Sequence, residues 1–158
     1  MFDDETRAFL MSGCALIIGT VRADGEPHAG RGWGLDVVVD AGDRAEVRLL
    51  LDADDLTTIE LAAAGGAMAI TAANVRTLRS VQMKGRSLGL AAPAAGDDER
   101  ARRYVDQFFT DIEDTDGTSP ELLAAFEPSG FVACNVEIVE RYDQTPGPGA
   151  GAPIPAEP

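Results

Sequence analysis

Short apolar segments separated by turn-forming residues recur along this sequence, which is typical of a β-rich protein. Several segments alternate apolar and polar residues, the period of a strand with one buried face. The pair Asp24-Gly25 lies between the first two segments and is typical of a tight hairpin turn. The pattern predicts six strands, at 13–22, 27–40, 45–51, 67–72, 77–91 and 130–141.

Apolar residues at helical spacing predict a few helices around these strands. In the clearest case, Tyr104 and Phe108 belong to one apolar stripe of a helix over 97–113. The expected architecture is mainly β, an antiparallel six-stranded β-barrel with a few peripheral helices. Shorter helices are predicted over 3–12, from Asp54 or Asp55 to Ala64, and around 121–126.

The end of the chain has a different composition from the rest. From Asp143 it reads DQTPGPGAGAPIPAEP, which is too rich in Pro and Gly for a regular packed element. We therefore expect one domain over 1–142, a normal length for a single core, and a C-terminal tail over 143–158. This tail is expected to be free or to lie on a partner.

Charge and cysteine content narrow the classes of partner and compartment. Thirteen Lys and Arg against 27 Asp and Glu give a net charge of −14, which repels nucleic acid and anionic lipid surfaces. We recognise no signal peptide in the sequence, and no apolar run approaches the ~20 residues that a membrane span requires. Cys14 and Cys134 lie in apolar runs and are expected to be buried free thiols. These features predict a cytoplasmic protein that binds neither nucleic acid nor membranes.

Few residues are candidates for catalysis or metal binding. His28 is the only histidine and has no partner at metal-ligand spacing, so no metal site is predicted and a surface or strand-edge position is expected. No GxSxG, GxxxxGK[ST] or GxGxxG motif is present. The motifs of the sequence therefore leave the catalytic residues unknown.

One predicted strand carries glycine at every second position, Gly30, Gly32 and Gly34. We expect these glycines to leave one strand face without side chains, where a flat ligand or another backbone approaches closely. Arg31 and Trp33 are expected to project together from the opposite face.

Three segments together resemble the FMN-binding split barrel of the pyridoxamine 5'-phosphate oxidase-like superfamily: GTVRADGEPHAGRGWG, VRLLLDADD with the helix after it, and LRSVQMKGRSLGL. The resemblance covers roughly residues 8–141. It implies a six-stranded antiparallel split β-barrel, a homodimer, and flavin mononucleotide (FMN) held at the dimer interface. It also implies a flavoprotein oxidoreductase acting on a small-molecule substrate.

The resemblance also assigns cofactor contacts to individual positions. Segment 31–36 resembles the strand whose leading arginine contacts FMN, and Leu50 and Leu51 fall where backbone contacts the ring. Ser80 falls at the glutamine of an Arg-Gln-Val run, here Arg79-Ser80-Val81. The cofactor-binding residues expected on this basis are Arg31, Gly32, Trp33, Gly34, Leu50, Leu51, Thr57, Ser80, Gln82 and Lys84.

The sequence departs from the family pattern at the expected phosphate site. Leu56 and Thr57 stand where the family has an Arg-Lys pair that grips the phosphate, and neither supplies a charge-assisted bond. Asp54 and Asp55 oppose an anion there. To replace the missing Arg-Lys pair, the available cations would have to converge on the phosphate; these are Arg31, Lys84 and Arg86.

These departures leave alternatives open. The C-terminal Trp and Arg signature with which the oxidase binds its vitamin substrate is missing, so pyridoxamine phosphate oxidase activity is not expected. The same barrel is compatible with a deazaflavin, or with haem ligated by His28. A dimeric binding module without cofactor or catalysis is the third alternative.

Overall fold

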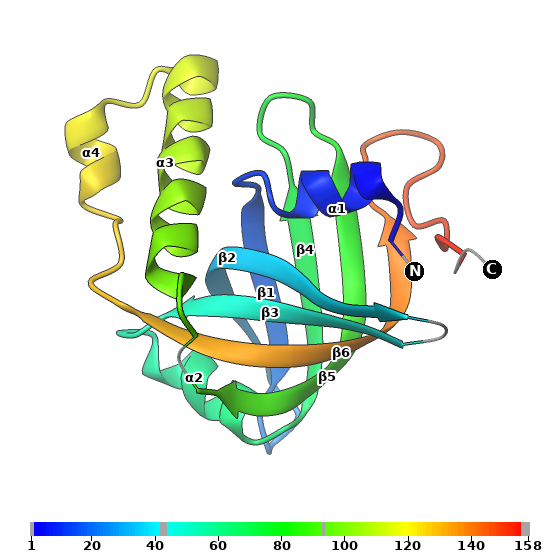
Figure 1. Ribbon diagram of the computed structural model, residues 1–158. Helices are drawn as coiled ribbons and strands as arrows, with labels where there is room; N and C mark the ends of the chain where they lie inside the picture. The colour runs from blue at the N-terminus through cyan, green and yellow to red at the C-terminus, as the bar shows by residue number, and fades with distance from the viewer. Residues whose placement is uncertain (1, 42–43, 93, 156–158) are drawn as a thin grey trace.

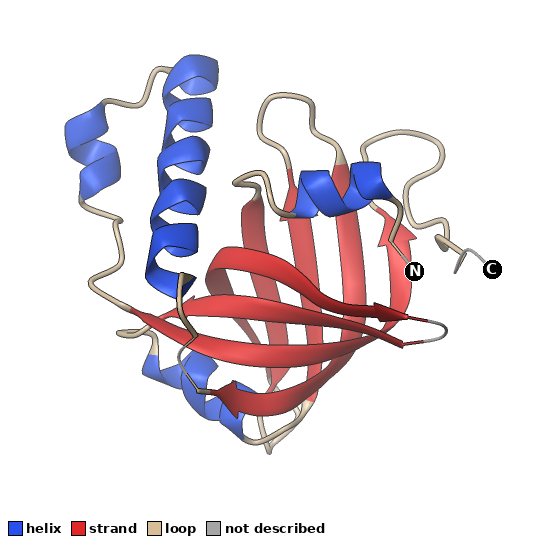
Figure 2. Ribbon diagram, in the orientation of Figure 1, coloured by secondary structure: helices blue, strands red, loops and turns tan. Residues whose placement is uncertain are grey.

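The six strands form one closed barrel in which every neighbouring pair is antiparallel, with strand order β1-β2-β3-β6-β5-β4 (Figures 1 and 2). The computed structural model describes residues 2–41, 44–92 and 94–155. The predicted six-stranded antiparallel barrel is confirmed. Its strands are β1 (Ala15–Val21), β2 (Pro27–Ala41), β3 (Arg44–Asp52), β4 (Ala67–Ala73), β5 (Ser80–Ala91) and β6 (Phe131–Asp143).

The helices lie outside the barrel and at its ends, as Figure 1 shows. α1 and α2 lie at opposite ends, α3 runs along the outside beside β2, and α4 follows α3. Gly117, with φ of 73°, ends α3 three residues later than the sequence predicted. The helices within the described ranges are α1 (Asp4–Leu10), α2 (Leu56–Ala63), α3 (Asp97–Asp116) and α4 (Pro120–Ala124).

β5 begins three residues later than predicted because a turn precedes it. The side-chain oxygen of Asn74 accepts hydrogen bonds from the backbone N–H groups of Arg76 and Thr77, at 3.0 and 2.9 Å. Leu78 then adopts a left-handed conformation, with φ of 61°. Such side-chain capping competes with strand pairing, so the ladder starts only at Ser80.

The barrel interior is filled by the chain's own side chains. Strand residues alternate between the two faces of the sheet, and the inward set from all six strands forms one continuous core. A ligand site therefore has to lie on the outer surface of the barrel. Fully buried members of this core include Leu16, Ile18, Leu49, Ile70, Met83 and Val136.

A bulge in β2 changes which residues face outward. The pairing of β2 with β3 shifts between Gly32 and Gly34, so Trp33 is an extra residue on its strand. A Cβ on Gly32 would lie 2.9 Å from Leu49 inside the barrel, whereas one on Gly34 would lie 2.9 Å from Leu50 outside it. The expectation that the glycines share one bare face is therefore wrong, and the space beside them is occupied.

A buried ion pair fixes α3 to the barrel. Arg48 of β3 donates from Nε and Nη2 to the two carboxylate oxygens of Asp97, at 3.0 and 2.5 Å. Arg100 also contacts Asp97 and reaches Asp36 of β2 at 2.9 Å. The Arg48 guanidinium lowers the pKa of Asp97, which keeps this carboxylate charged in the folded protein. The first turn of α3 is thereby held against β2 and β3.

The C-terminal segment folds back onto its own chain. The backbone N–H of Gln144 donates to the Ser80 carbonyl at 2.8 Å, and that of Ile154 donates to the Arg141 carbonyl at 2.8 Å. Ile154 also packs against the barrel core. Gly151, with φ of 88°, provides the reversal that Pro and Gly in this segment permit. Up to residue 155 the segment is thus an arm laid on its own barrel.

The two cysteines are buried free thiols, as predicted. Burial raises the pKa of Cys14 to about 11, so its thiol is not activated as a nucleophile. No helix in the described part of the chain has the length and apolar character needed to cross a membrane.

The close approach of Gly85 in β5 to β6, where β6 has one extra residue in the ladder, provides a test of the barrel geometry. A Cβ on Gly85 would lie 1.8 Å from the backbone carbonyl oxygen of Glu137, so Gly85→Ala should lower the free energy of unfolding by about 3 kcal/mol or more. Gly66→Ala is the matched control, because no atom lies within 4 Å of its Cβ position. Urea unfolding followed by circular dichroism measures both. Equal stability of the two variants would contradict this packing of β5 on β6.

Candidate functional site

The outward face of β1 and β4 is a surface of small and uncharged residues. Ile17 and Val21 on this face are 44% and 54% exposed. Exposed apolar sheet surface without charge is typical of a contact site, above all in a chain with a net charge of −14. The outward positions are Ala15, Ile17, Gly19 and Val21 of β1, and Ala67, Ala69, Thr71 and Ala73 of β4.

Arg31 borders this face, directly opposite Ile17 in the β1–β2 ladder. Its guanidinium carbon lies 5.4 Å from the ring centroids of both Trp33 and Phe108. Partial burial against these rings lowers the pKa of Arg31, and none of the described carboxylates forms an ion pair with it. A cation positioned in this way, without a counter-ion, is available to contact a ligand. The prediction that Arg31 and Trp33 project together is confirmed.

Aromatic side chains of α3 form a wall beside Arg31. The ring of Trp33 makes edge-to-face contacts with Phe108 and Phe109, at centroid distances of 6.4 and 6.1 Å. Trp33 is the only tryptophan of the chain and is 5% exposed. Sequence reasoning placed Phe108 in the core stripe of α3, and the structure shows that this stripe packs on the outer side of β2.

An acid-rich pocket of about 410 Å³ adjoins Arg31 on the other side. It lies between the end of β3, the start of α2 and residues 125–129, which precede β6. Asp55 caps α2 by accepting from the N–H and the hydroxyl of Thr58, at 3.0 and 2.6 Å. Four carboxylates and one arginine thus line the same pocket, the acids being Asp52, Asp54, Asp55 and Glu127.

This pocket does not fit a phosphate dianion, which is what the family resemblance requires of it. Leu56 is 71% exposed and Thr57 is uncharged, so the start of α2 supplies no cation. The N–H of Thr58 is already bonded to Asp55. Among the described residues that line the pocket, Arg31 is the only basic one. The chain therefore offers a surface for the ring of the cofactor but lacks the cations that its phosphate group would need.

Three other predicted contacts are buried away from Arg31's surface. Leu50 is 2% exposed and lies beneath Ala101 of α3, while Leu51 belongs to the barrel core. The backbones of both leucines are paired with β2 and β6. Ser80 is 9% exposed, and its N–H donates to the hydroxyl of Thr145 at 3.1 Å. The C-terminal segment thus covers the serine.

Gln82 and Lys84 face outward from β5, on the far side of the same sheet surface. Gln82 donates to the Thr71 hydroxyl at 3.2 Å, and the Lys84 ammonium lies 4.6 Å from the ring centroid of Tyr142. The ladders place Arg31, Ile17, Thr71 and Gln82 in one row across four strands. Three strand spacings amount to about 14 Å, so within one copy Arg31 does not converge with Gln82 or Lys84.

Both ring nitrogens of His28 are engaged. Arg22 lies 3.2 Å from Nδ1, and Nε2 lies 3.1 Å from the Thr58 hydroxyl, which donates to Asp55. An arginine can only donate, so we assign the imidazole proton to Nε2. Among the described residues, no group of three or more His, Cys, Asp or Glu is arranged to hold a metal ion.

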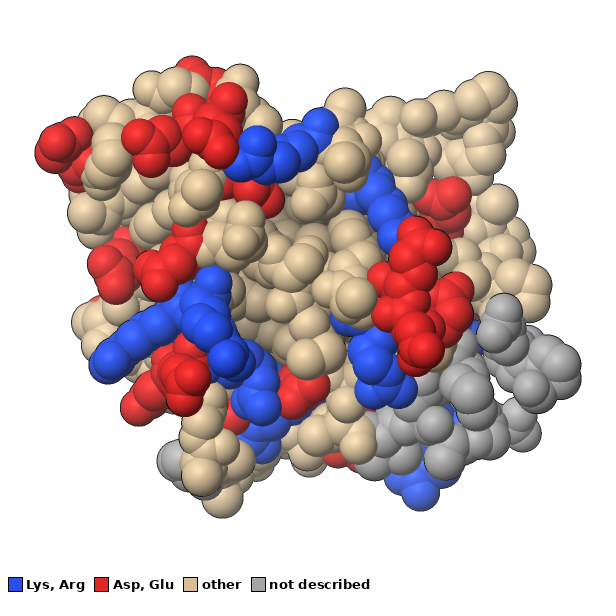
Figure 3. All heavy atoms as spheres, turned by 45° about the horizontal axis from the view of Figure 1, so that its top comes forward, with Lys and Arg blue, Asp and Glu red and all other residues tan. Residues whose placement is uncertain are grey.

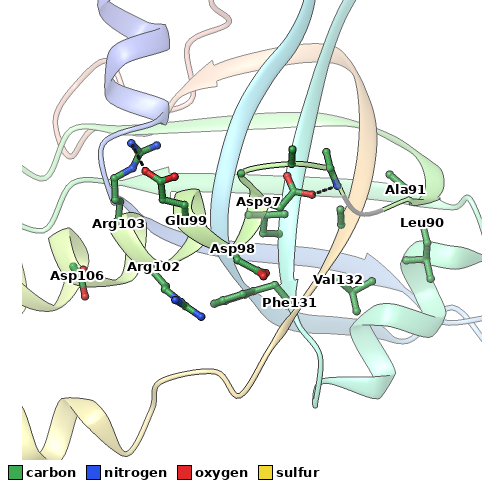
Figure 4. Close-up of a pocket in the computed structure, with 15 residues that line it drawn as sticks. Leu90, Ala91, Asp97, Asp98, Glu99, Arg102, Arg103, Asp106, Phe131 and Val132 are labelled. Atoms are coloured by element: carbon green, nitrogen blue, oxygen red, sulfur yellow. Dashed lines mark hydrogen bonds and ion pairs between the residues drawn. The ribbon is translucent and has the colours of Figure 1, made fainter.

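A second hollow, of about 730 Å³, lies between the first half of α3, the end of β5 and the start of β6 (Figure 4). Leu50 is the only predicted contact that lines it. Its charged rim is already paired in part, because Arg103 contacts Glu99 at 3.6 Å and Asp97 binds Arg48. On the face seen in Figure 3, Lys and Arg are interleaved with Asp and Glu, so no broad basic surface is presented there.

No family model matches the sequence, and no curated protein matches it. Solved structures do match. The crystal structure of HupZ from Group A Streptococcus is 15% identical, with a TM-score of 0.56, over 96% of this chain and 100% of that chain. An F420 reductase is 16% identical, with a TM-score of 0.52, over 85% and 94% of the two chains.

A third match is a protein of the pyridoxinephosphate oxidase family from Clostridium acetobutylicum, 11% identical with a TM-score of 0.48, over 88% of this chain and 84% of that chain. At such identities the likeness concerns the fold. With the closed six-stranded barrel described above, the matches to HupZ and to the F420 reductase show that this chain shares the fold of those proteins, which is the split barrel that the sequence resemblance implied.

Proposed function

We propose that this chain is a homodimeric oxidoreductase that binds a flavin-type ring on the outward face of β1, β2 and β4. The observation that carries the proposal is the position of Arg31. Its guanidinium is stacked on Trp33 and Phe108 at the edge of a sheet surface without carboxylates. A flat, uncharged surface bordered by an oriented cation suits a planar heteroaromatic ring with polar edges. The fold shared with an F420 reductase supports redox chemistry on such a ring.

The geometry favours a second copy of the chain as the partner. The sheet face and the aromatic wall of α3 offer only two sides of a site, whereas ligand sites bury most of their ligand. A two-fold dimer brings the same face of a second copy against this one. In such a dimer, the partner subunit's Gln82 and the partner subunit's Lys84 would lie near Arg31 of the first copy. Within one copy, Gln82 and Lys84 are remote from Arg31. This arrangement would make Arg31, Trp33, Gln82 and Lys84 members of one composite site.

The residues of this chain bind and orient, while a bound flavin supplies the hydride or electron transfer. Arg31 donates hydrogen bonds toward the ring edge, and Phe108 and Phe109 hold Trp33 rigidly behind it. The apolar surface around Ile17 excludes water from the ring. Haem is less well supported, because each ring nitrogen of His28 already has a hydrogen-bond partner, and one of these partners would have to be released to ligate iron.

The proposed dimer is tested by placing a charge at the centre of its face. Ile17→Glu should raise the dimer dissociation constant by roughly 100-fold or more, because two unpaired carboxylates would be buried near the two-fold axis. Light scattering coupled to size exclusion measures the mass of each species. Val139→Glu is the control, since Val139 is 68% exposed on β6. A variant Ile17→Glu as dimeric as its parent would rule out this interface.

The role of Arg31 is tested by removing its guanidinium. Arg31→Ala should weaken flavin binding by ~1.5–3 kcal/mol, roughly ten- to more than hundredfold, through loss of one charge-assisted contact. The melting temperature of the ligand-free protein should change little, because cation–π contacts at exposed sites contribute only ~0.5–1 kcal/mol. Arg103→Ala, at an exposed ion pair on α3, should leave affinity unchanged. Unaltered binding by Arg31→Ala would show that the site lies elsewhere.

A further inference from the structure

We propose that the acid-rich pocket beside Arg31 takes an uncharged, hydroxyl-bearing tail and rejects a phosphate ester. The flavin bound by this chain is then of the riboflavin type and not FMN. This inference rests on the function proposed above and specifies the chemical class of the ligand. The carrying observation is the contrast between the uncharged sheet face and the adjoining pocket with its four carboxylates.

The charges in this pocket oppose an anion. Asp52, Asp54, Asp55 and Glu127 line it together with a single cation, Arg31. A carboxylate about 8 Å from a phosphate dianion weakens its binding roughly two- to fivefold, depending on salt. Several such carboxylates outweigh one arginine. A phosphate in this pocket would therefore bind less well than the neutral alcohol from which it is formed.

The same carboxylates offer acceptors for hydroxyl groups. Asp52 accepts one hydrogen bond through Oδ1, and Asp54 accepts one from Ser129 through Oδ2, at 2.9 and 2.8 Å. Among the described contacts, the second oxygen of each aspartate and both oxygens of Glu127 remain available. Arg31 adds donors to the same pocket. A polyhydroxylated chain satisfies both sets, because each hydroxyl donates and accepts.

The start of α2 does not reverse this preference. Helix N-termini attract anions through free N–H groups, but Asp55 already occupies the N–H of Thr58 with its own negative charge. Leu56 and Thr57, the first two residues of α2, carry no charge. Nothing within the described part of this pocket besides Arg31 supplies positive charge to a phosphate.

The experiment compares riboflavin and FMN on the full-length protein through the fluorescence of Trp33, the only tryptophan and part of the site. Riboflavin should bind with equal or higher affinity than FMN. Raising the salt concentration should strengthen FMN binding and leave riboflavin binding unchanged, because salt screens repulsion. FMN bound more than tenfold tighter, with affinity that falls with salt, would overturn the inference while sustaining the proposed function. Failure of both flavins to bind would overturn the proposed function and this inference with it.

A charge-removing variant locates the repulsion. Asp54→Asn combined with Glu127→Gln should raise FMN affinity roughly three- to tenfold at low salt, whereas riboflavin affinity should not rise and should fall modestly, because an amide oxygen is a weaker acceptor for its hydroxyls than a carboxylate. Both side chains are exposed, and Asn can still accept from Ser129, so the fold should be retained. Asp4→Asn combined with Glu5→Gln removes the same charge from α1, at the opposite end of the barrel. An equal gain in the control pair would assign the effect to net charge and refute a role for this pocket.

Discussion

The bulge in β2 is the constraint on which both the core and the candidate site depend. A strand without it would place Leu35 on the same outer face as Arg31 and Trp33, and would turn Asp36 into the barrel. The extra residue shifts the alternation, so Leu35 is fully buried while Asp36 faces outward to meet Arg100. Gly34 makes this possible, because any side chain there would press on Leu50.

The position of α3 follows from the same strand. Trp33, placed outward by the bulge, packs on Phe108 and Phe109, while the Arg48–Asp97 ion pair holds the first turn of the helix. These two attachments lie at separate points along one helix and therefore fix its orientation. The result is a rigid aromatic wall beside an open sheet face, which is the arrangement that positions Arg31.

Charge is distributed unevenly around this arginine. The outward positions of β1 and β4 carry no charge, whereas the pocket at the start of α2 carries four carboxylates. The barrel interior is full, so recognition depends on this surface and its electrostatic boundary. A ligand with a neutral ring and a polar, uncharged end would bind in one orientation only, with the ring on the uncharged sheet face and the polar end in the acidic pocket. At the proposed site, the excess of acidic residues that gives the whole chain its negative charge would act locally against phosphate esters.

Sequence alone determined the features that depend on local periodicity and composition. Alternation predicted the six strands, helical spacing predicted α3, and the isolated cysteines predicted buried thiols. The projection of Arg31 and Trp33 from one strand was also readable, because residues two apart share a face.

Only the tertiary structure decided what surrounds those residues. The β2 bulge, the cover of Ser80 by Thr145 and the pocket shared by Glu127 and Arg31 involve positions far apart in the chain. No local pattern encodes such contacts, since they depend on how the barrel closes and on where α3 and the C-terminal segment pack. The substitution of Leu56 and Thr57 for a basic pair was visible in the sequence. That carboxylates of two separate segments, 52–55 and 125–129, line the same pocket as Arg31 was decided by the fold.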